Sequence, residues 1–105
     1  MGKPMPEEKW RSLVAHLRVT CPVTRRLVVH RVPMLKNHGT TSLPESEKTI
    51  TISVNSTDDE TVQRDSLVHE WAHAMEFDKT GNHGPVWGKF SSQTYSAGVA
   101  WDGQQ

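Results

Sequence analysis

The stretch TITISVNSTDDETVQRDSLVHEWAHAMEF, residues 49–77, joins a strand pattern to a long helix pattern, and the expected fold is built around it. In its first part, Ile50, Ile52 and Val54 alternate with threonine and serine. Strict alternation places apolar side chains on one face of an extended chain and polar side chains on the other. Residues 49–55 are therefore predicted to form a half-buried strand.

The second part predicts an amphipathic helix from about residue 58 to about residue 77, because its apolar positions recur at helical spacing. The apolar stripe comprises Val62, Leu67, Val68, Trp71, Ala72 and Met75. Thr57 and Glu60 match a Thr-x-x-Glu capping box at the start of the helix. Gly81 supplies a stop at its end.

The remaining segments complete a small α+β arrangement. An apolar stripe predicts a helix over residues 7–20, and a β-branched run predicts a strand over 26–32. Residues 33–48 hold two prolines and many small polar side chains, so we expect a long loop or a loose edge segment. A last helix is expected over about 85–97, with proline in its first turn. The order α-β-β-α-α predicts one domain over residues 1–105, a short antiparallel or mixed sheet packed on the central helix.

The bulk composition indicates a small intracellular domain. With 105 residues, of which 34% are hydrophobic, the chain can build only a limited core, so a bound metal would help to stabilise it. Cys21 is the single cysteine, which excludes an intramolecular disulfide and favours a reducing compartment. The N-terminus lacks the apolar core of a signal peptide, and no apolar run approaches the roughly 20 residues that span a bilayer. We therefore expect a cytoplasmic protein with no membrane partner.

Charge is distributed unevenly along the chain. Residues 1–36 carry eight Lys or Arg against two Glu, a net charge of +6, and residues 37–105 carry −6. Such asymmetry can mark a basic face that contacts DNA. The basic residues are not tightly clustered, however, and the alternative is that the two parts of the chain face each other and neutralise each other.

His69, Glu70 and His73 form a His-Glu-x-x-His motif on the predicted central helix. At 100° per residue the two histidines lie about 40° apart around the helix axis and one turn apart along it, so both imidazoles can reach one ion. Glu70 lies about 60° from His73, close enough to contact a metal-bound water without ligating the metal. This polar trio interrupts an otherwise apolar helix. Burying such polar side chains costs free energy unless a hydrogen-bond partner or a metal ion compensates for it. The pattern is typical of a catalytic Zn²⁺ site with Glu70 as the general base.

A catalytic zinc takes three protein ligands and keeps a fourth position open. His83 follows the Gly81 turn, where the chain can double back toward the same ion, and it is the predicted third ligand. Asp78, five residues after His73, is a rival ligand. Glu76, one turn after His73, is a weaker rival that we expect to support a ligand or to face solvent.

The segment HEWAHAMEFDKTGNHGPVWGKF, residues 69–90, resembles the SprT-like (Spartan-related) zinc metallopeptidases, and most closely their small phage-type members. In that family the His-Glu-x-x-His motif is followed by a third histidine in a His-Gly-Pro-x-aromatic context. The resemblance covers residues 58–90 and, loosely, the strand at 49–55. It implies a minimal zincin-like domain with His69, His73 and His83 as ligands and Glu70 as general base, in a host-cell cytoplasm if the chain is phage-encoded. Larger members carry a C-terminal zinc ribbon built on cysteine pairs, which this chain cannot form.

The expected function is that of a zinc-dependent metalloendopeptidase acting on a protein or peptide substrate, with DNA-associated proteins as one candidate class. Tyr95 on the last helix and His38 in the 33–48 segment are candidate donors to the oxyanion that forms during peptide hydrolysis. The alternative is a non-catalytic module that zinc stabilises and that binds nucleic acid or protein. A third hypothesis is a metal-free helical domain with surface histidines, but it leaves the polar interruption of the central helix unexplained.

Overall fold

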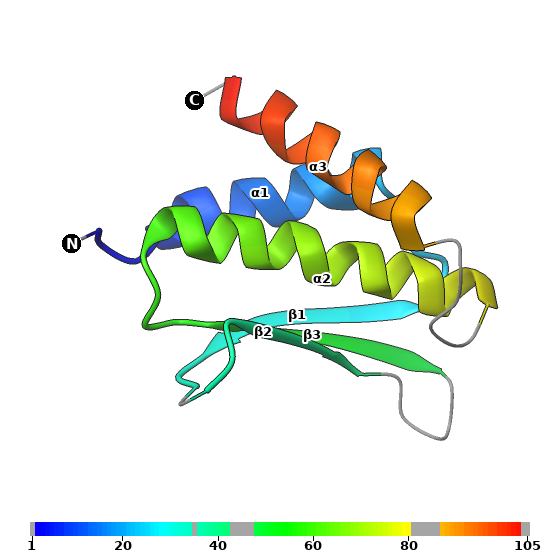
Figure 1. Cartoon of the computed structure of the whole chain (residues 1–105), viewed down its shortest axis with the longest axis horizontal. Coiled ribbons are helices and arrows are strands. Elements are labelled where there is room, and N and C mark those ends of the chain that lie inside the picture. Colours follow the sequence, from blue (N-terminus) through cyan, green and yellow to red (C-terminus); the bar gives the residue numbers. More distant parts are fainter. Residues whose placement is uncertain (1, 35, 43–47, 81–86, 104–105) are drawn as a thin grey trace.

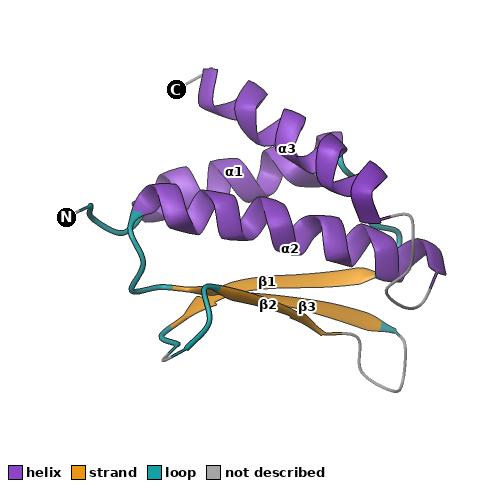
Figure 2. Ribbon diagram, in the orientation of Figure 1, coloured by secondary structure: helices purple, strands orange, loops and turns teal. Residues whose placement is uncertain are grey.

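The computed structural model describes residues 2–34, 36–42, 48–80 and 87–103 of the chain. Its elements are, in order, α1 (Glu7–Thr20), β1 (Arg26–Val32), β2 (Gly39–Ser42), β3 (Thr49–Asn55), α2 (Glu60–Thr80) and α3 (Trp87–Gly103). All three helices lie on one side of the sheet, and α2 runs along it while α3 lies beyond α2 (Figure 1). Figure 2 shows the same separation of helices from strands. The chain is therefore an α+β fold, as expected.

The sheet is mixed and has the strand order β1-β3-β2. The central strand β3 pairs in parallel with β1 and antiparallel with β2. Ile50, Ile52 and Val54 of β3 are fully buried, whereas the threonines and serine between them are only partly covered. This pattern confirms the half-buried strand predicted over residues 49–55.

The strand β2 corrects the predicted order α-β-β-α-α, since the structure is α-β-β-β-α-α. We expected a loop or a loose edge segment over residues 33–48, but Gly39–Ser42 form a regular edge strand in which Thr41 pairs with Ile52. The sequence GTTS has no apolar alternation. Its strand conformation comes from backbone pairing with β3, which residue patterns do not report.

The start of α2 also differs from the prediction. The Asp59 carboxylate accepts a hydrogen bond from the Val62 amide at 2.9 Å, so Asp59 is the N-cap. The Thr57 hydroxyl donates instead to Asn55 Oδ1 at 2.7 Å. The predicted capping box of Thr57 and Glu60 is therefore wrong, because the Thr57 hydroxyl forms its hydrogen bond within the turn that follows β3. The predicted stop at Gly81 lies outside the described residues.

The core lies between the sheet and the helices. It joins Leu13 and Leu17 of α1 to Leu67 and Trp71 of α2, all fully buried. The Trp71 indole N–H donates to the backbone carbonyl of Cys21 at 2.8 Å, which satisfies its polar atom inside the core. Within the described parts of the chain, no helix has the length and apolar character needed to cross a membrane.

Candidate metal and catalytic site

The helix α2 brings His69 and His73 together, as their spacing predicts. Their Nε2 atoms lie 3.1 Å apart, and the two rings meet edge to face with centroids 4.7 Å apart. Two nitrogens bound to one tetrahedral zinc at 2.0–2.1 Å would lie roughly 3.3 Å from each other. The observed separation therefore fits a pair of ligands to one zinc ion.

Glu70 points from α2 toward the edge strand β2. Only 9% of the residue is exposed. The Thr41 hydroxyl lies 2.7 Å from its Oε1 atom and 3.0 Å from its backbone carbonyl oxygen. Gly39 lies against the same side chain, since a Cβ atom at position 39 would come within 3.0 Å of Glu70 Cγ. The predicted general base thus sits in a well-defined environment, made by a strand that the sequence did not reveal.

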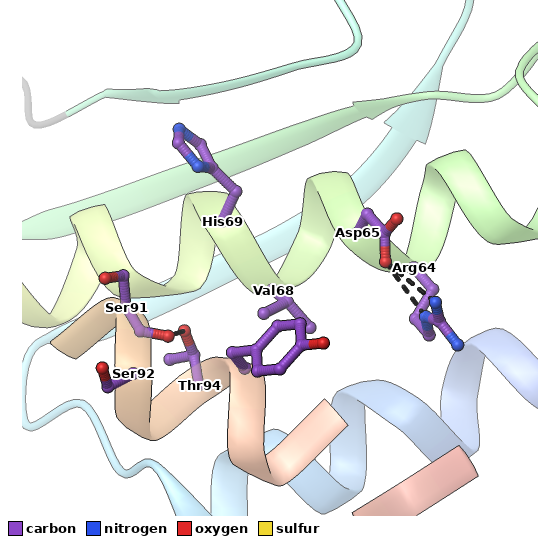
Figure 3. A pocket seen from close by; sticks show the side chains of 8 residues that line it. Arg64, Asp65, Val68, His69, Ser91, Ser92 and Thr94 are labelled. Carbon is purple, nitrogen blue, oxygen red and sulfur yellow. Dashed lines mark hydrogen bonds and ion pairs between the residues drawn. The ribbon is translucent and has the colours of Figure 1, made fainter. Parts of the chain in front are cut away.

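Two cavities meet at His69. One, of about 480 Å³, lies between the start of α2 and the segment before β2, and His38, Gly39, His69 and Glu70 are among its lining residues. The other, of about 530 Å³, lies between α2 and α3. Figure 3 shows this second cavity, with His69 and Val68 on α2 and Ser91 and Thr94 on α3. His69 therefore borders open space on two sides.

Each of the two oxyanion candidates lines one of these cavities. Tyr95 lines the cavity between α2 and α3 together with His69, and 66% of it is exposed. His38 lines the cavity that contains Glu70. Its Nδ1 atom lies 2.7 Å from Asp58 Oδ2, so a carboxylate orients the ring. No sequence pattern pairs Asp58 with His38, because the two residues lie 20 positions apart in the chain.

Asp78, a rival for the third ligand position, is engaged elsewhere. Its carboxylate accepts hydrogen bonds from the Thr24 amide at 2.9 Å, the Thr24 hydroxyl at 2.8 Å and the Arg25 amide at 3.0 Å. Burial raises the pKa of this carboxyl, but the hydrogen bonds from Thr24 and Arg25 outweigh burial and hold the pKa below its ordinary value. Asp78 therefore fastens α2 to the turn before β1, and this contact disfavours it as a metal ligand.

Glu76, the other rival, is fully buried on α2, so it does not face solvent. The predicted ligand His83 lies outside the described residues. In the ranges that the structure does describe, no group of three His, Cys, Asp or Glu side chains converges to hold a metal ion. The described part of the site therefore consists of the two histidines of α2 and the adjacent Glu70.

Several basic side chains of residues 1–36 are held by the rest of the fold. Lys9 pairs with Glu60 at 3.1 Å, and Arg25 donates to the Phe77 carbonyl at 2.7 Å. Arg31 hydrogen-bonds to α2 as well and stacks over an indole ring of α1. These contacts engage three of the eight basic side chains of residues 1–36 within the fold and make those three less available to DNA.

Comparison with protein-family models, with curated proteins and with solved structures gave no match. The function of this chain is therefore inferred from the geometry of the site and from the His-Glu-x-x-His motif.

Proposed function

We propose that this protein is a zinc-dependent metalloendopeptidase that hydrolyses peptide bonds through a metal-activated water. The observation that carries the proposal is the 3.1 Å approach of the His69 and His73 Nε2 atoms, with Glu70 beside His69 in the same cavity. Histidines four residues apart can approach each other on any helix, so the largely buried Glu70 in the cavity that His69 lines is what supports a catalytic role for the pair.

The roles follow from the chemistry of these side chains. His69 and His73, with His83 as third ligand, would hold Zn²⁺, which supplies Lewis acidity and lowers the pKa of a bound water to about 7. Glu70 takes the proton of the attacking water on its carboxylate and passes it to the leaving amine. His38, oriented by Asp58, and Tyr95 are the candidates that could donate a hydrogen bond to the developing oxyanion.

The substrate in this proposal is a protein or peptide. An association of that substrate with DNA is implied only by the SprT-like resemblance, and the internal contacts of Lys9, Arg25 and Arg31 weaken it. The alternative, a zinc-stabilised binding module without catalysis, is less well supported. A structural zinc site closes its fourth position and needs no proton acceptor, whereas here Glu70 lines a cavity beside His69.

Elemental analysis of the purified chain, together with hydrolysis of fluorescein-labelled casein, tests this function. We expect about one zinc per chain in the wild type, little zinc in His73→Ala and His83→Ala, and full zinc content in Glu70→Gln. Casein hydrolysis should fall by at least about 100-fold in Glu70→Gln, because general base catalysis contributes on this order.

His30→Ala is the matched control for the histidine variants. His30 is exposed on β1 and its ring contacts Ser53 Oγ at 2.7 Å, away from the site. This variant should keep both zinc and activity. Zinc that persists in His83→Ala would exclude the three-histidine site, and zinc-loaded protein without hydrolysis would favour the binding module.

A further inference from the structure

The edge strand β2 encloses the side chain of Glu70 in two ways. The Thr41 hydroxyl lies 2.7 Å from Glu70 Oε1, the shorter of its two contacts with this residue. Gly39, two residues earlier and on the same face of the strand, leaves the space in which Glu70 Cγ lies. Both residues pair with β3, Gly39 with Val54 and Thr41 with Ile52, so the backbone that holds them is fixed by the sheet.

We propose that Thr41 and Gly39 are positioning residues for Glu70: Thr41 binds one carboxylate oxygen, and Gly39 leaves room for Cγ, so that the side chain stays at the cavity that His69 also lines. This inference deepens the proposed peptidase function and rests on it. Thr41 acts through Glu70 and not on the substrate.

The physical reason is the flexibility of a glutamate side chain. An unsupported carboxylate samples several rotamers, and a proton acceptor is efficient only when it is held near the proton it must take. An ionised carboxylate accepts hydrogen bonds on both oxygens. A hydroxyl bound to Oε1 thus restricts the rotamer while Oε2 stays available. A Cβ at position 39 would lie 3.0 Å from Glu70 Cγ, which is tight, and 3.5 Å from Oε2, which is an ordinary contact, so a larger residue there would displace Cγ.

Two variants of Thr41 separate the hydroxyl from the shape of the side chain. Thr41→Val keeps the shape and removes the donor, whereas Thr41→Ser keeps the donor. The matched control is Thr40→Val, the same exchange at the adjacent, exposed position on the opposite face of β2. In zinc-loaded protein, Thr41→Val should lower kcat for casein-derived peptides by about 10- to 100-fold, the effect typical of residues that orient a catalytic group. KM and zinc content should stay within twofold, and Thr41→Ser and Thr40→Val should stay close to the wild type.

A double-mutant cycle gives a second test of the positioning role, and this test requires neither bound zinc nor enzymatic activity. The unfolding equilibrium is measured by urea titration for wild type, Thr41→Val, Glu70→Ala and the double variant, all in EDTA. If the hydroxyl holds the carboxylate, Thr41→Val should lower the folding equilibrium constant by a factor about tenfold larger in the wild type than in the Glu70→Ala background. A coupling of this size lies in the range found for directly interacting pairs. Gly39→Ala should likewise cost less in the Glu70→Ala background, because the contact with Cγ is then absent.

The outcomes separate the two proposals. Additive effects of Thr41→Val and Glu70→Ala, or a Thr41→Val enzyme with wild-type kcat, would overturn the positioning role whether or not the chain is a peptidase. A coupled cycle in EDTA, together with a zinc-loaded wild type that hydrolyses no peptide, would overturn the peptidase function and with it any catalytic role of Thr41. Coupling together with a selective loss of kcat would establish both.

Discussion

At the scale of single residues, Asp78 shows how a carboxylate near a metal motif can have a structural role. Its three hydrogen bonds to Thr24 and Arg25 tie the C-terminal half of α2 to the turn that leads into β1. This contact joins residues more than 50 positions apart in the chain. The orientation of α2 against β1, and hence of the histidine pair above the sheet, depends partly on it.

The depressed pKa of Asp78 predicts a pH-dependent contribution to stability. Because the carboxyl ionises at lower pH in the folded chain than in the unfolded chain, its stabilisation is complete above the unfolded pKa, near 4, and is lost as pH falls through the folded value. Asp78→Asn should therefore lower the free energy of unfolding by about 1 kcal/mol at pH 7, a figure reduced for partial exposure.

Urea titrations of both proteins between pH 7 and pH 3 test this expectation. The difference between wild type and Asp78→Asn should shrink as pH falls below about 4. A difference that stays constant across this range would show that the charge of Asp78 does not contribute. Zinc content should be unchanged in Asp78→Asn, in contrast to His83→Ala.

At the scale of elements, α3 extends further than its sequence pattern indicates. The expected helix ended near residue 97, but the structure continues it to Gly103. Ala97 is 8% exposed and Trp101, one turn later, is 2% exposed, so the buried face persists beyond the predicted end. The Trp101 indole N–H donates to the Ser12 hydroxyl at 3.0 Å, which joins α3 to α1.

Trp101→Ala should lower the free energy of unfolding by about 3–5 kcal/mol, the range typical of removing a large buried aromatic side chain. Val99→Ala on the same helix is the control. Val99 is 55% exposed, and surface changes of this kind usually alter stability by less than about 0.5 kcal/mol. Thermal unfolding followed by circular dichroism measures both. Similar stability for the two variants would show that the last turns of α3 do not belong to the core.

At the scale of the whole molecule, the candidate site lies where three parts of the fold meet. His69 and His73 come from α2, the surroundings of Glu70 come from β2, and one of the two cavities at His69 is bounded by α3. A ligand at this point would contact α2, the segment that leads into β2, and α3, which lie in the middle and the C-terminal part of the chain. Binding there should therefore stabilise the fold as a whole, since a small domain has a limited core of its own.

Zinc should raise the melting temperature of the wild type and of His30→Ala, but not of His73→Ala. At a free zinc concentration 100 times the dissociation constant, the stabilisation is about 2.7 kcal/mol, which corresponds to a shift on the order of 10 °C for a domain of this size. Excess EDTA should reverse the shift. Scanning calorimetry with and without zinc gives the comparison, and an equal shift in His73→Ala would place the metal elsewhere.

Much of the fold could be predicted because its signals are local. The bounds of α1, β1 and β3 agree with the predicted 7–20, 26–32 and 49–55, since each has an apolar pattern of the correct period and a clear boundary. Helical geometry predicts that His69 and His73 lie one turn apart on the same side of α2, and the side-chain rotamers bring their Nε2 atoms to 3.1 Å.

The sequence by itself determined the α+β class, the central helix and the placing of His69, Glu70 and His73 on adjoining faces of one turn. These properties depend on residues that lie close together in the sequence, so local patterns are sufficient to predict them. Only the tertiary structure decided that Gly39–Ser42 form an edge strand, that Thr41 contacts Glu70 and that Asp78 caps the turn before β1. The strand pairs join residues 9 to 15 positions apart, and the contacts of Thr41 and Asp78 join residues 29 and 54 positions apart. Their partners are set by how the strands pair and how the helices pack on the sheet.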